Sequence, residues 1–218
     1  TVSARDRRDS VIGFIVVGTT TPDTIFPSTA CVLQNKIGAT RCWGFDLGAA
    51  CSGFTYALTV GMQMVASGAH DHALVVGADT MSSIIDYTDR TTCIIFGDGG
   101  GAAVVQRTAD GAPPGMIDYI YEVDGSGGPA LCLPGGGSRN PTSQDTLEKR
   151  MHFVHQDGQV VFKFATRKMS DLCVKLLERN GLTGKDVDLF VPHQANLRII
   201  TYSAERIGLA MEKVVVNI

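Results

Sequence analysis

The fold is decided by the stretch GFDLGAACSGF, which occupies residues 44–54. A short apolar, glycine-bearing segment leads to Cys51, and Phe54, Leu58, Met62 and Val65 then recur at helical spacing. This pattern predicts a strand that delivers a cysteine to the first turn of an amphipathic helix. Small residues on both sides of Cys51 leave room for a substrate at the sulfur.

A cysteine at the start of a helix is a candidate nucleophile. The thiolate is the reactive form, and the unpaired N–H groups and dipole of a helix N-terminus lower the pKa of a thiol placed there. The same N–H groups are able to hold an oxyanion. The alternative is that Cys51 is a core residue, because free cysteines are among the most buried side chains.

Strand and helix patterns alternate around this stretch. Apolar runs predict buried strands, helical spacing predicts helices, and the glycines at 97–101 predict a hairpin turn rather than a phosphate loop. The expected strands are 11–17, 41–47, 73–76, 91–96 and 102–105, and the expected helices are 28–37 and 54–67. This order predicts parallel crossover units in a layered α/β fold.

The second half of the chain repeats the theme after a long irregular region. Residues 110–159 are rich in Gly, Pro and polar side chains, and a long helix, a strand at 186–191, a second helix and a strand at 214–216 follow. The strands 10–17 and 186–191 both open onto a helix through a short loop, which suggests two related halves. We therefore expect a first half at 1–110 carrying Cys51, a connecting and active-site loop region at 111–159, and a second half at 160–218.

Two further side chains could carry chemistry. His193 follows Pro192 at the end of a predicted buried strand, where active-site side chains of α/β folds commonly emerge, although a capping or core histidine fits the local pattern equally. Arg90 taken alone reads as a solvated surface charge. His152 and His155 have no Glu or Cys at ligand spacing, so no metal site is predicted.

Composition and net charge limit the classes of partner and the cellular compartment that we expect for this protein. The chain has 218 residues, 44% of them hydrophobic, and a formal net charge of −3 with no basic block, so nucleic acid is not expected as a partner. The longest apolar run is too short to span a bilayer. Six scattered cysteines without a Cys-x-x-Cys pair favour reduced thiols, and we expect a cytoplasmic protein.

Three motifs together resemble a known family. AACSGF at 49–54, FGDG at 96–99 and PHQANLR at 192–198 look like β-ketoacyl-[acyl carrier protein] synthase III, the condensing enzyme that starts bacterial fatty-acid synthesis. The resemblance also covers 25–28, 133–141 and 161–164, and so runs over nearly the whole chain. It implies a thiolase-like αβαβα sandwich of two related halves, here incomplete, and a homodimer.

The resemblance also implies the reaction. Cys51 would attack a short acyl-CoA, typically acetyl-CoA, and malonyl-[acyl carrier protein] would then lose CO₂ and attack the acyl-Cys51. His193 and an asparagine would stabilise the enolate oxyanion. The coenzyme A thioester and the carrier protein are substrates, and no cofactor is expected.

Other positions match the family one by one. Arg90, Ala195 and Asn196 correspond to coenzyme A contacts, and Gly158 falls in the pantetheine region. Met81 and Phe96 correspond to the acyl pocket. Phe26 corresponds to the residue that reaches across the dimer to floor the partner's pocket, and its bulk implies a short primer. Lys163 and Arg198 are candidates for pairing with the acidic carrier protein.

The chain departs from the family pattern at both ends. It lacks the family's N-terminal segment, and it stops before the Gly-Asn-Thr-Ser motif that supplies the catalytic Asn. Asn217 follows the strand at 214–216 too closely to be that residue. We therefore expect either that these residues are the interior of a longer protein, with the third catalytic group beyond Ile218, or that they cannot condense efficiently alone.

Three alternatives stay open at this point. The nearest is a related Cys-His-Asn condensing enzyme of polyketide or other secondary metabolism. A non-catalytic, thiolase-fold partner subunit is a second, although Cys51 is retained. A papain-like cysteine protease combines the same residue types, but the α/β pattern does not fit it.

Overall fold

The computed structural model describes residues 12–109, 111–112 and 115–218. These form two compact units: one consists of the chain up to Ser83 with Gly97–Met116, and the other of Ile84–Phe96 with Ile117–Ile218. The predicted boundary at residue 110 thus falls inside the last segment of the first unit. The three-part division of the chain stays a prediction.

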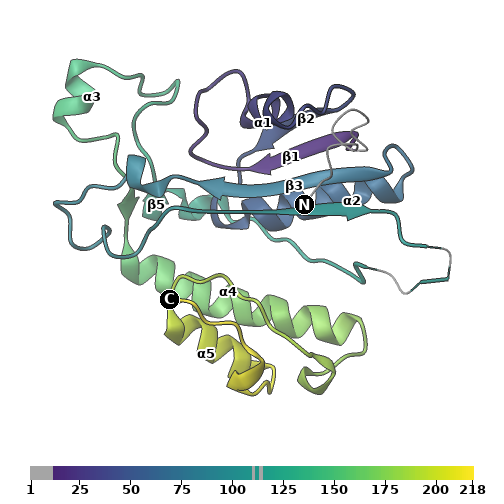
Figure 1. Cartoon of the computed structure of the whole chain (residues 1–218). Coiled ribbons are helices and arrows are strands. Elements are labelled where there is room, and N and C mark those ends of the chain that lie inside the picture. Colours follow the sequence, from purple (N-terminus) through teal and green to yellow (C-terminus); the bar gives the residue numbers. More distant parts are fainter. Residues whose placement is uncertain (1–11, 110, 113–114) are drawn as a thin grey trace. The chain divides into compact units, whose positions relative to one another are not determined.

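The first unit is built on a four-stranded sheet (Figure 1). Its strand order is β2-β1-β3-β4, and β1, β2 and β3 run parallel while β4 is antiparallel to β3. The strands are β1 Phe14–Gly18, β2 Trp43–Leu47, β3 His72–Asp79 and β4 Gly99–Gln106. The helices are α1 Thr29–Ile37 and α2 Gly53–Ala66.

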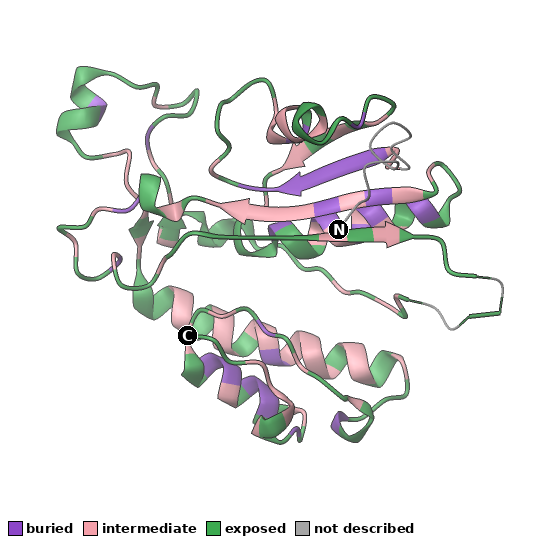
Figure 2. Cartoon of the chain, in the orientation of Figure 1, coloured by how far each residue is buried: buried purple, intermediate pink, exposed green. Residues whose placement is uncertain are grey.

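Strand β1 is the centre of this unit, and Figure 2 shows it buried along its length. Because successive side chains of a strand point to opposite faces, β1 contributes residues to two hydrophobic clusters, one on each face of the sheet. Phe14 and Val16 pack with Ala57 and Val65 of α2. Ile15 and Val17 pack with Ala30 of α1 and with Leu33 beside it. The sheet is therefore covered by α2 on one face and by α1 on the other.

The predicted bounds of helix α1 are confirmed. Ser28 is the N-cap, and its side chain accepts a hydrogen bond from the Cys31 N–H. Asp46 of β2 accepts from the N–H groups of Thr29 and Ala30 at 2.7 and 2.8 Å, which joins the helix start to the sheet. Gly38 ends the helix in the left-handed region at φ 68°, directly after the predicted last residue.

The predicted hairpin at 91–105 is wrong. Residues 91–96 form turns, because the Asp89 carboxylate and carbonyl take the N–H groups of Thr91, Thr92 and Cys93 that a strand ladder would need. The glycines at 99–101 lie inside β4, which pairs with β3 instead. The predicted first strand begins at Phe14, and its residue Val11 lies outside the described residues.

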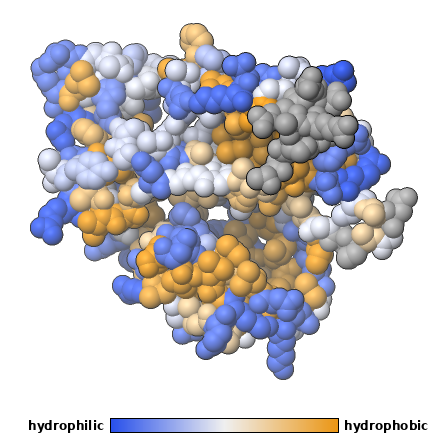
Figure 3. Space-filling view, viewed as in Figure 1, coloured by the Kyte–Doolittle hydropathy of each residue, from blue (hydrophilic) through white to orange (hydrophobic). Residues whose placement is uncertain are grey.

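The second unit is dominated by α4 Gly158–Arg179, which packs against α5 Leu197–Arg206. Residues 110–159, expected to be irregular, also hold α3 Gln144–Glu148 and a small pair of strands, β5 Leu131–Cys132 and β6 His155–Gln156. Exposed apolar side chains here include Leu189, Val191 and Leu197, and Figure 3 shows hydrophobic surface in the region of α4 and α5.

Ion pairs hold an extended segment of the second unit to α4. Asp118 pairs with Arg179, and Glu122 accepts from Lys168 and Lys175, both at 2.6 Å. These cations and hydrogen bonds lower the pKa of both Asp118 and Glu122 to about 2.

The strands expected at 186–191 and 214–216 meet only as an isolated bridge. Phe190 is bridged to Val214, while residues 184–186 form a 3₁₀ turn closed by the Thr183–Asp186 capping box. The Asp186 carboxylate accepts from both the N–H and the hydroxyl of Thr183 at 2.8 Å, so the start of the expected strand is held in this turn.

Two glycine contacts place the start of α2 against the sheet. A Cβ on Gly18, the last residue of β1, would lie 2.5 Å from the carbonyl carbon and oxygen of Gly53, and a Cβ on Gly77 would lie 3.0 Å from Phe54 Cβ. The first turn of α2 therefore rests on the ends of β1 and β3 at a distance that only glycine allows. This packing fixes the turn that holds Cys51.

We predict that Gly18→Ala destabilises the protein by about 1–3 kcal/mol, as expected for overpacking against backbone. Chemical denaturation measures the change. Gly101→Ala is the matched control, because a Cβ there meets nothing within 4 Å. Equal stability of the two variants would contradict the packing described for the start of α2.

Candidate active site

Cys51 lies in a sharp turn between β2 and α2. The turn is a short 3₁₀ helix, Ala50–Ser52, and the Ser52 N–H donates to the Ala49 carbonyl at 3.0 Å. Ala50 has φ 44°, a left-handed conformation that costs energy for a residue with a Cβ. A strained residue thus directly precedes the exposed residue Cys51. The predicted strand–Cys–helix order is confirmed.

The expected low pKa of Cys51 is wrong. The residue is exposed, yet enough protein surrounds the sulfur for desolvation to raise the thiol pKa above its ordinary value. A hydrogen bond from the Cys51 backbone lowers the pKa, and the negative charge of Asp79 raises it further. The helix start alone therefore does not make Cys51 a thiolate at neutral pH.

Asp79 ends β3 and organises the loop that follows β1. Its Oδ1 accepts from the hydroxyl of Thr19 at 3.1 Å, from the N–H of Thr20 at 2.7 Å and from the hydroxyl of Thr21 at 2.9 Å. The Thr80 N–H donates in turn to the Thr21 hydroxyl at 2.7 Å. The ends of β1 and β3 are thus joined through one carboxylate.

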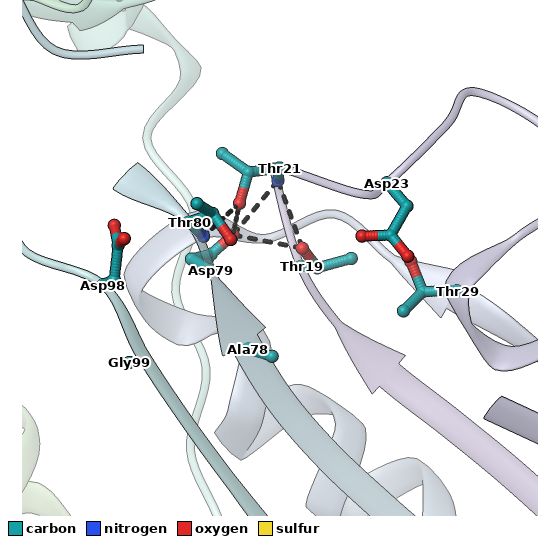
Figure 4. A pocket seen from close by; sticks show the side chains of 9 residues that line it. All are labelled: Thr19, Thr21, Asp23, Thr29, Ala78, Asp79, Thr80, Asp98 and Gly99. Atoms are coloured by element: carbon teal, nitrogen blue, oxygen red, sulfur yellow. Dashed lines mark hydrogen bonds between the residues drawn. The ribbon is translucent and has the colours of Figure 1, made fainter. Parts of the chain in front are cut away.

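An open pocket of about 260 Å³ lies at these strand ends. Figure 4 shows Asp79 among the threonines, Asp23 beside Thr29, and Asp98 on the other side. Cys51 is not among the residues that line it. Among the described residues no group of three His, Cys, Asp or Glu side chains is arranged to hold a metal ion.

Two predicted acyl-pocket residues of the first unit lie in loops. Asp98, from the FGDG motif, accepts from the Ser82 N–H and hydroxyl, both at 2.7 Å, and so fixes the turn that carries Met81. Phe26 is 83% exposed, and its neighbour Ile25 is 89% exposed. Phe26 therefore fills no pocket of its own chain.

His193 lies in a loop of the second unit that Gln194 holds in place. The Gln194 amide donates to the Val215 carbonyl at 2.9 Å, and its oxygen accepts from the Asn217 N–H at 2.9 Å. Asn196 is the N-cap of α5, with its Oδ1 accepting from the Arg198 N–H at 2.9 Å. Part of the PHQANLR motif is thus explained by local structure.

Desolvation lowers the pKa of His193. The imidazole is therefore neutral at pH 7, with one nitrogen carrying a proton and the other free to accept one. A neutral imidazole donates a hydrogen bond to a developing oxyanion without adding a charge to the site.

The remaining predicted residues of the second unit are placed as follows. Arg90 is exposed in a turn, and Gly158 is the first residue of α4. Phe96 is half-buried at the end of the turns that follow Asp89, and Ala195 is exposed between Gln194 and Asn196.

The two residues proposed to contact a carrier protein lie close together. The Arg198 guanidinium lies 4.9 Å above the ring of Phe162, and Lys163 is the next residue on α4. Lys163 and Arg198 are both exposed. Cys51 and His193 belong to different units, and their pairing stays a prediction.

Sequence reasoning missed Asp79, the strain at Ala50 and the ion pair of Asp86 with Arg150. Asp79 gave no local signal, because its partners lie about 60 residues away. The repeated Asp-x-Thr pattern at 86–88 and 89–91 is a signal of side-chain-stabilised turns and would have excluded a strand there.

Two family models match the chain. The model for 3-oxoacyl-[acyl-carrier-protein] synthase III matches residues 45–125, and the model for the C-terminal part of the same enzyme matches residues 177–218. Between them they contain the Cys51 turn and the His193 loop.

Curated relatives agree over almost the whole chain. Beta-ketoacyl-[acyl-carrier-protein] synthase III of Koribacter versatilis is 56% identical over 204 residues, which are 94% of this chain and 61% of that protein. The enzyme of the same name from Solibacter usitatus is 55% identical over 95% of this chain and 63% of its own length. The chain belongs to the 3-oxoacyl-[acyl-carrier-protein] synthase III family. It spans a little over three fifths of the length of these two relatives.

Solved structures confirm the thiolase-like α/β fold class. The synthase III of Thermus thermophilus matches with a TM-score of 0.85 and 39% identity, over 98% of this chain and 64% of that one. The priming β-ketosynthase of the R1128 polyketide pathway matches with a TM-score of 0.82 and 37% identity, over 94% of this chain and 60% of that one.

We predict that alkylation of Cys51 by iodoacetamide has a pH midpoint above the value of about 8.5 for a free thiol. Asp79→Asn should move this midpoint downward, because it removes a negative charge and keeps an oxygen that accepts the threonine hydrogen bonds. Peptide-resolved mass spectrometry over a pH series measures both, with a short cysteine peptide blocked at both ends as reference. A wild-type midpoint below that of the reference would overturn the assignment.

Proposed function

We propose that this protein transfers a short acyl group, in the first instance acetyl, from acyl-CoA to Cys51 and condenses it with malonyl-[acyl carrier protein], which initiates fatty-acid synthesis. The observation that carries the proposal is the exposed Cys51 on a strained strand-to-helix turn, in a chain of the synthase III family. A nucleophile that must meet a bulky thioester needs this kind of exposure.

The reaction proceeds in two steps. Cys51 loses its proton, its sulfur attacks the thioester carbonyl, and coenzyme A leaves as a thiol, which gives acyl-Cys51. Malonyl-[acyl carrier protein] then loses CO₂, and the resulting enolate attacks acyl-Cys51, which releases the Cys51 thiolate and a 3-oxoacyl carrier. A neutral His193 supports the second step by donating a hydrogen bond to the enolate oxygen.

The remaining substrate contacts that we propose are carried over from the family resemblance. Arg90 contacts the nucleotide of coenzyme A, and Gly158, Ala195 and Asn196 contact its pantetheine arm. Met81 and Phe96 line the acyl pocket. The exposed cations Lys163 and Arg198 contact the acidic carrier protein, because positive side chains favour an anionic partner.

We also propose a homodimer in the cytoplasm, with no cofactor beyond the substrates. Ile25 and Phe26 are almost fully exposed, and Trp43 and Phe45 are exposed on β2, which is an edge strand. Large apolar side chains at a sheet edge favour pairing with a second copy. The described residues contain no helix long and apolar enough to cross a membrane.

A second candidate is the priming of a polyketide, which the similarity to the R1128 priming β-ketosynthase favours. Both candidates use the same first step and differ in the carrier that supplies the malonyl group. Comparing condensation on fatty-acid and polyketide carrier proteins separates them.

Incubation with acetyl-CoA should add one acetyl group to the protein, and intact-mass measurement detects it. Cys51→Ala should abolish the adduct, while Cys31→Ala, which removes another exposed thiol, should keep it. A wild-type protein without the adduct would refute the nucleophile assignment and favour a non-catalytic partner subunit. A Cys51→Ala variant that retains the adduct would place the acetyl group on another residue.

His193→Ala should slow the decarboxylation of malonyl-[acyl carrier protein] by about 10²–10³-fold, the usual cost of losing an oxyanion donor. Because the pKa of His193 is lowered, the neutral form persists below the ordinary value of about 6.5, and the rate should fall only at a lower pH. Rates of CO₂ release over a pH series, in the longest form of the protein that its gene encodes, measure both. His155→Ala is the control, and a rate already halved at pH 6.5 or above would contradict this role.

A further inference from the structure

Arg90 lies in a turn that two aspartates build. Asp86 Oδ1 accepts from the Thr88 N–H at 2.9 Å and from its hydroxyl at 2.6 Å. Asp89 Oδ1 accepts from the Thr91 N–H at 2.9 Å and from its hydroxyl at 2.6 Å. Arg90 is the residue between Asp89 and Thr91, so its backbone is held inside the second of two consecutive turns.

The turn has a buried base and an exposed tip. Thr92 is 2% exposed, and its hydroxyl donates to Asp89 Oδ2 at 2.9 Å. The Asp89 N–H donates to the Asp86 carbonyl at 3.0 Å, which links the first turn to the second. Arg90 is exposed, and within the described part of the chain its side chain makes no hydrogen bond or ion pair. Among the described residues the Arg90 side chain is therefore available to bind a ligand, while hydrogen bonds order its backbone.

A cation from a distant loop braces this turn. Arg150 Nε donates to Asp86 Oδ2 at 3.0 Å, and Arg150 Nη2 pairs with the same oxygen at 2.5 Å. Nη2 also donates to the Thr88 hydroxyl at 3.4 Å. The guanidinium also lies 4.8 Å above the ring of Phe153. The Val154 N–H donates to the Ile84 carbonyl at 2.9 Å, which joins the two segments a second time.

Both residues of the Arg150–Asp86 contact are constrained by their surroundings. Arg150 has φ 54°, a left-handed conformation that is unfavourable for a residue with a Cβ and that the Asp86 and Phe153 contacts help to offset. The Asp86 side chain is only 14% exposed, and the hydrogen bond from Arg150 holds its pKa far below the ordinary range. The neighbouring Lys149, by contrast, makes an exposed i,i+4 pair with Asp145.

We propose that Arg150 is a positioning residue: through Asp86 it holds the turn that aims Arg90 at the phosphate-bearing nucleotide of the acyl-CoA substrate. The inference rests on the proposed function and names how that site selects its substrate. Without the brace the turn must be ordered when the substrate binds, and this cost falls only on substrates that carry the nucleotide.

The test compares two thioesters, acetyl-CoA and S-acetyl-pantetheine, which lacks the nucleotide. Arg150→Ala should raise the KM for acetyl-CoA about 3- to 10-fold, as expected for one side chain that must be immobilised on binding, and leave kcat unchanged. The KM for S-acetyl-pantetheine should not change. Acylation of Cys51 by quenched-flow mass spectrometry, in the longest form of the protein that its gene encodes, gives both constants.

Four further variants sharpen the test. Arg150→Lys should restore little, because lysine cannot contact Asp86 and Thr88 as a planar fork. Asp86→Asn keeps the shape of the acceptor and should give the same selective rise if Arg150→Ala fails to fold. Adding Arg150→Ala to Arg90→Ala should produce no further rise. Lys149→Ala, the matched control, should change neither constant.

The outcomes separate this inference from the proposed function. Equal loss with both thioesters, or an unchanged KM for acetyl-CoA in Arg150→Ala, overturns the positioning role while acylation of the wild type leaves the proposed function standing. A wild-type protein that is acylated by neither thioester overturns the proposed function and this inference with it.

Discussion

The contact of Gly18 with Gly53 is the constraint on which the Cys51 turn depends. It joins the last residue of β1, the most buried strand, to the first residue of α2. The sheet supplies the rigid end, and the absence of a side chain allows the helix to approach it. Cys51 precedes this contact by two residues, so the turn that holds it has little freedom to relax, which accounts for the left-handed Ala50 beside it.

The two units are stabilised in different ways. In the first, both faces of β1 are covered by apolar side chains from α1 and α2, and burial supplies most of the stability. In the second, extended segments with few ladder partners are held by side-chain contacts: Asp118 and Glu122 to α4, Gln194 to the segment at 214–217, and Asp86 to Arg150. Such contacts fix a chain locally, and the exposed ion pairs among them weaken at high salt.

Sequence patterns correctly predicted the helices and strands that form because apolar side chains are buried. They failed for segments whose conformation is set by polar side chains that bind the backbone. The 3.6-residue spacing of Phe54, Leu58, Met62 and Val65 identified α2 because that helix packs on a sheet. The residues 91–96 look like a strand in composition, but Asp89 captures the N–H groups that a ladder requires. The ion pair of Asp86 with Arg150 joins positions 64 residues apart, and the local sequence at either residue does not predict it.

The loops that carry predicted site residues are each held in place by hydrogen bonds to a polar side chain. Asp98 in the turn of Met81, and Asp86 and Asp89 beside Arg90, each accept backbone N–H and hydroxyl donors, so these carboxylates fix the position of a loop. In the His193 loop the Gln194 oxygen accepts the Asn217 N–H, and its amide donates to the Val215 carbonyl. Asp79 does the same for the threonines after β1, and it alone acts on the thiol, where its charge opposes ionisation of Cys51. Each of these loops is therefore ordered by its own side-chain contacts, and the helix start alone does not supply the energy to ionise Cys51.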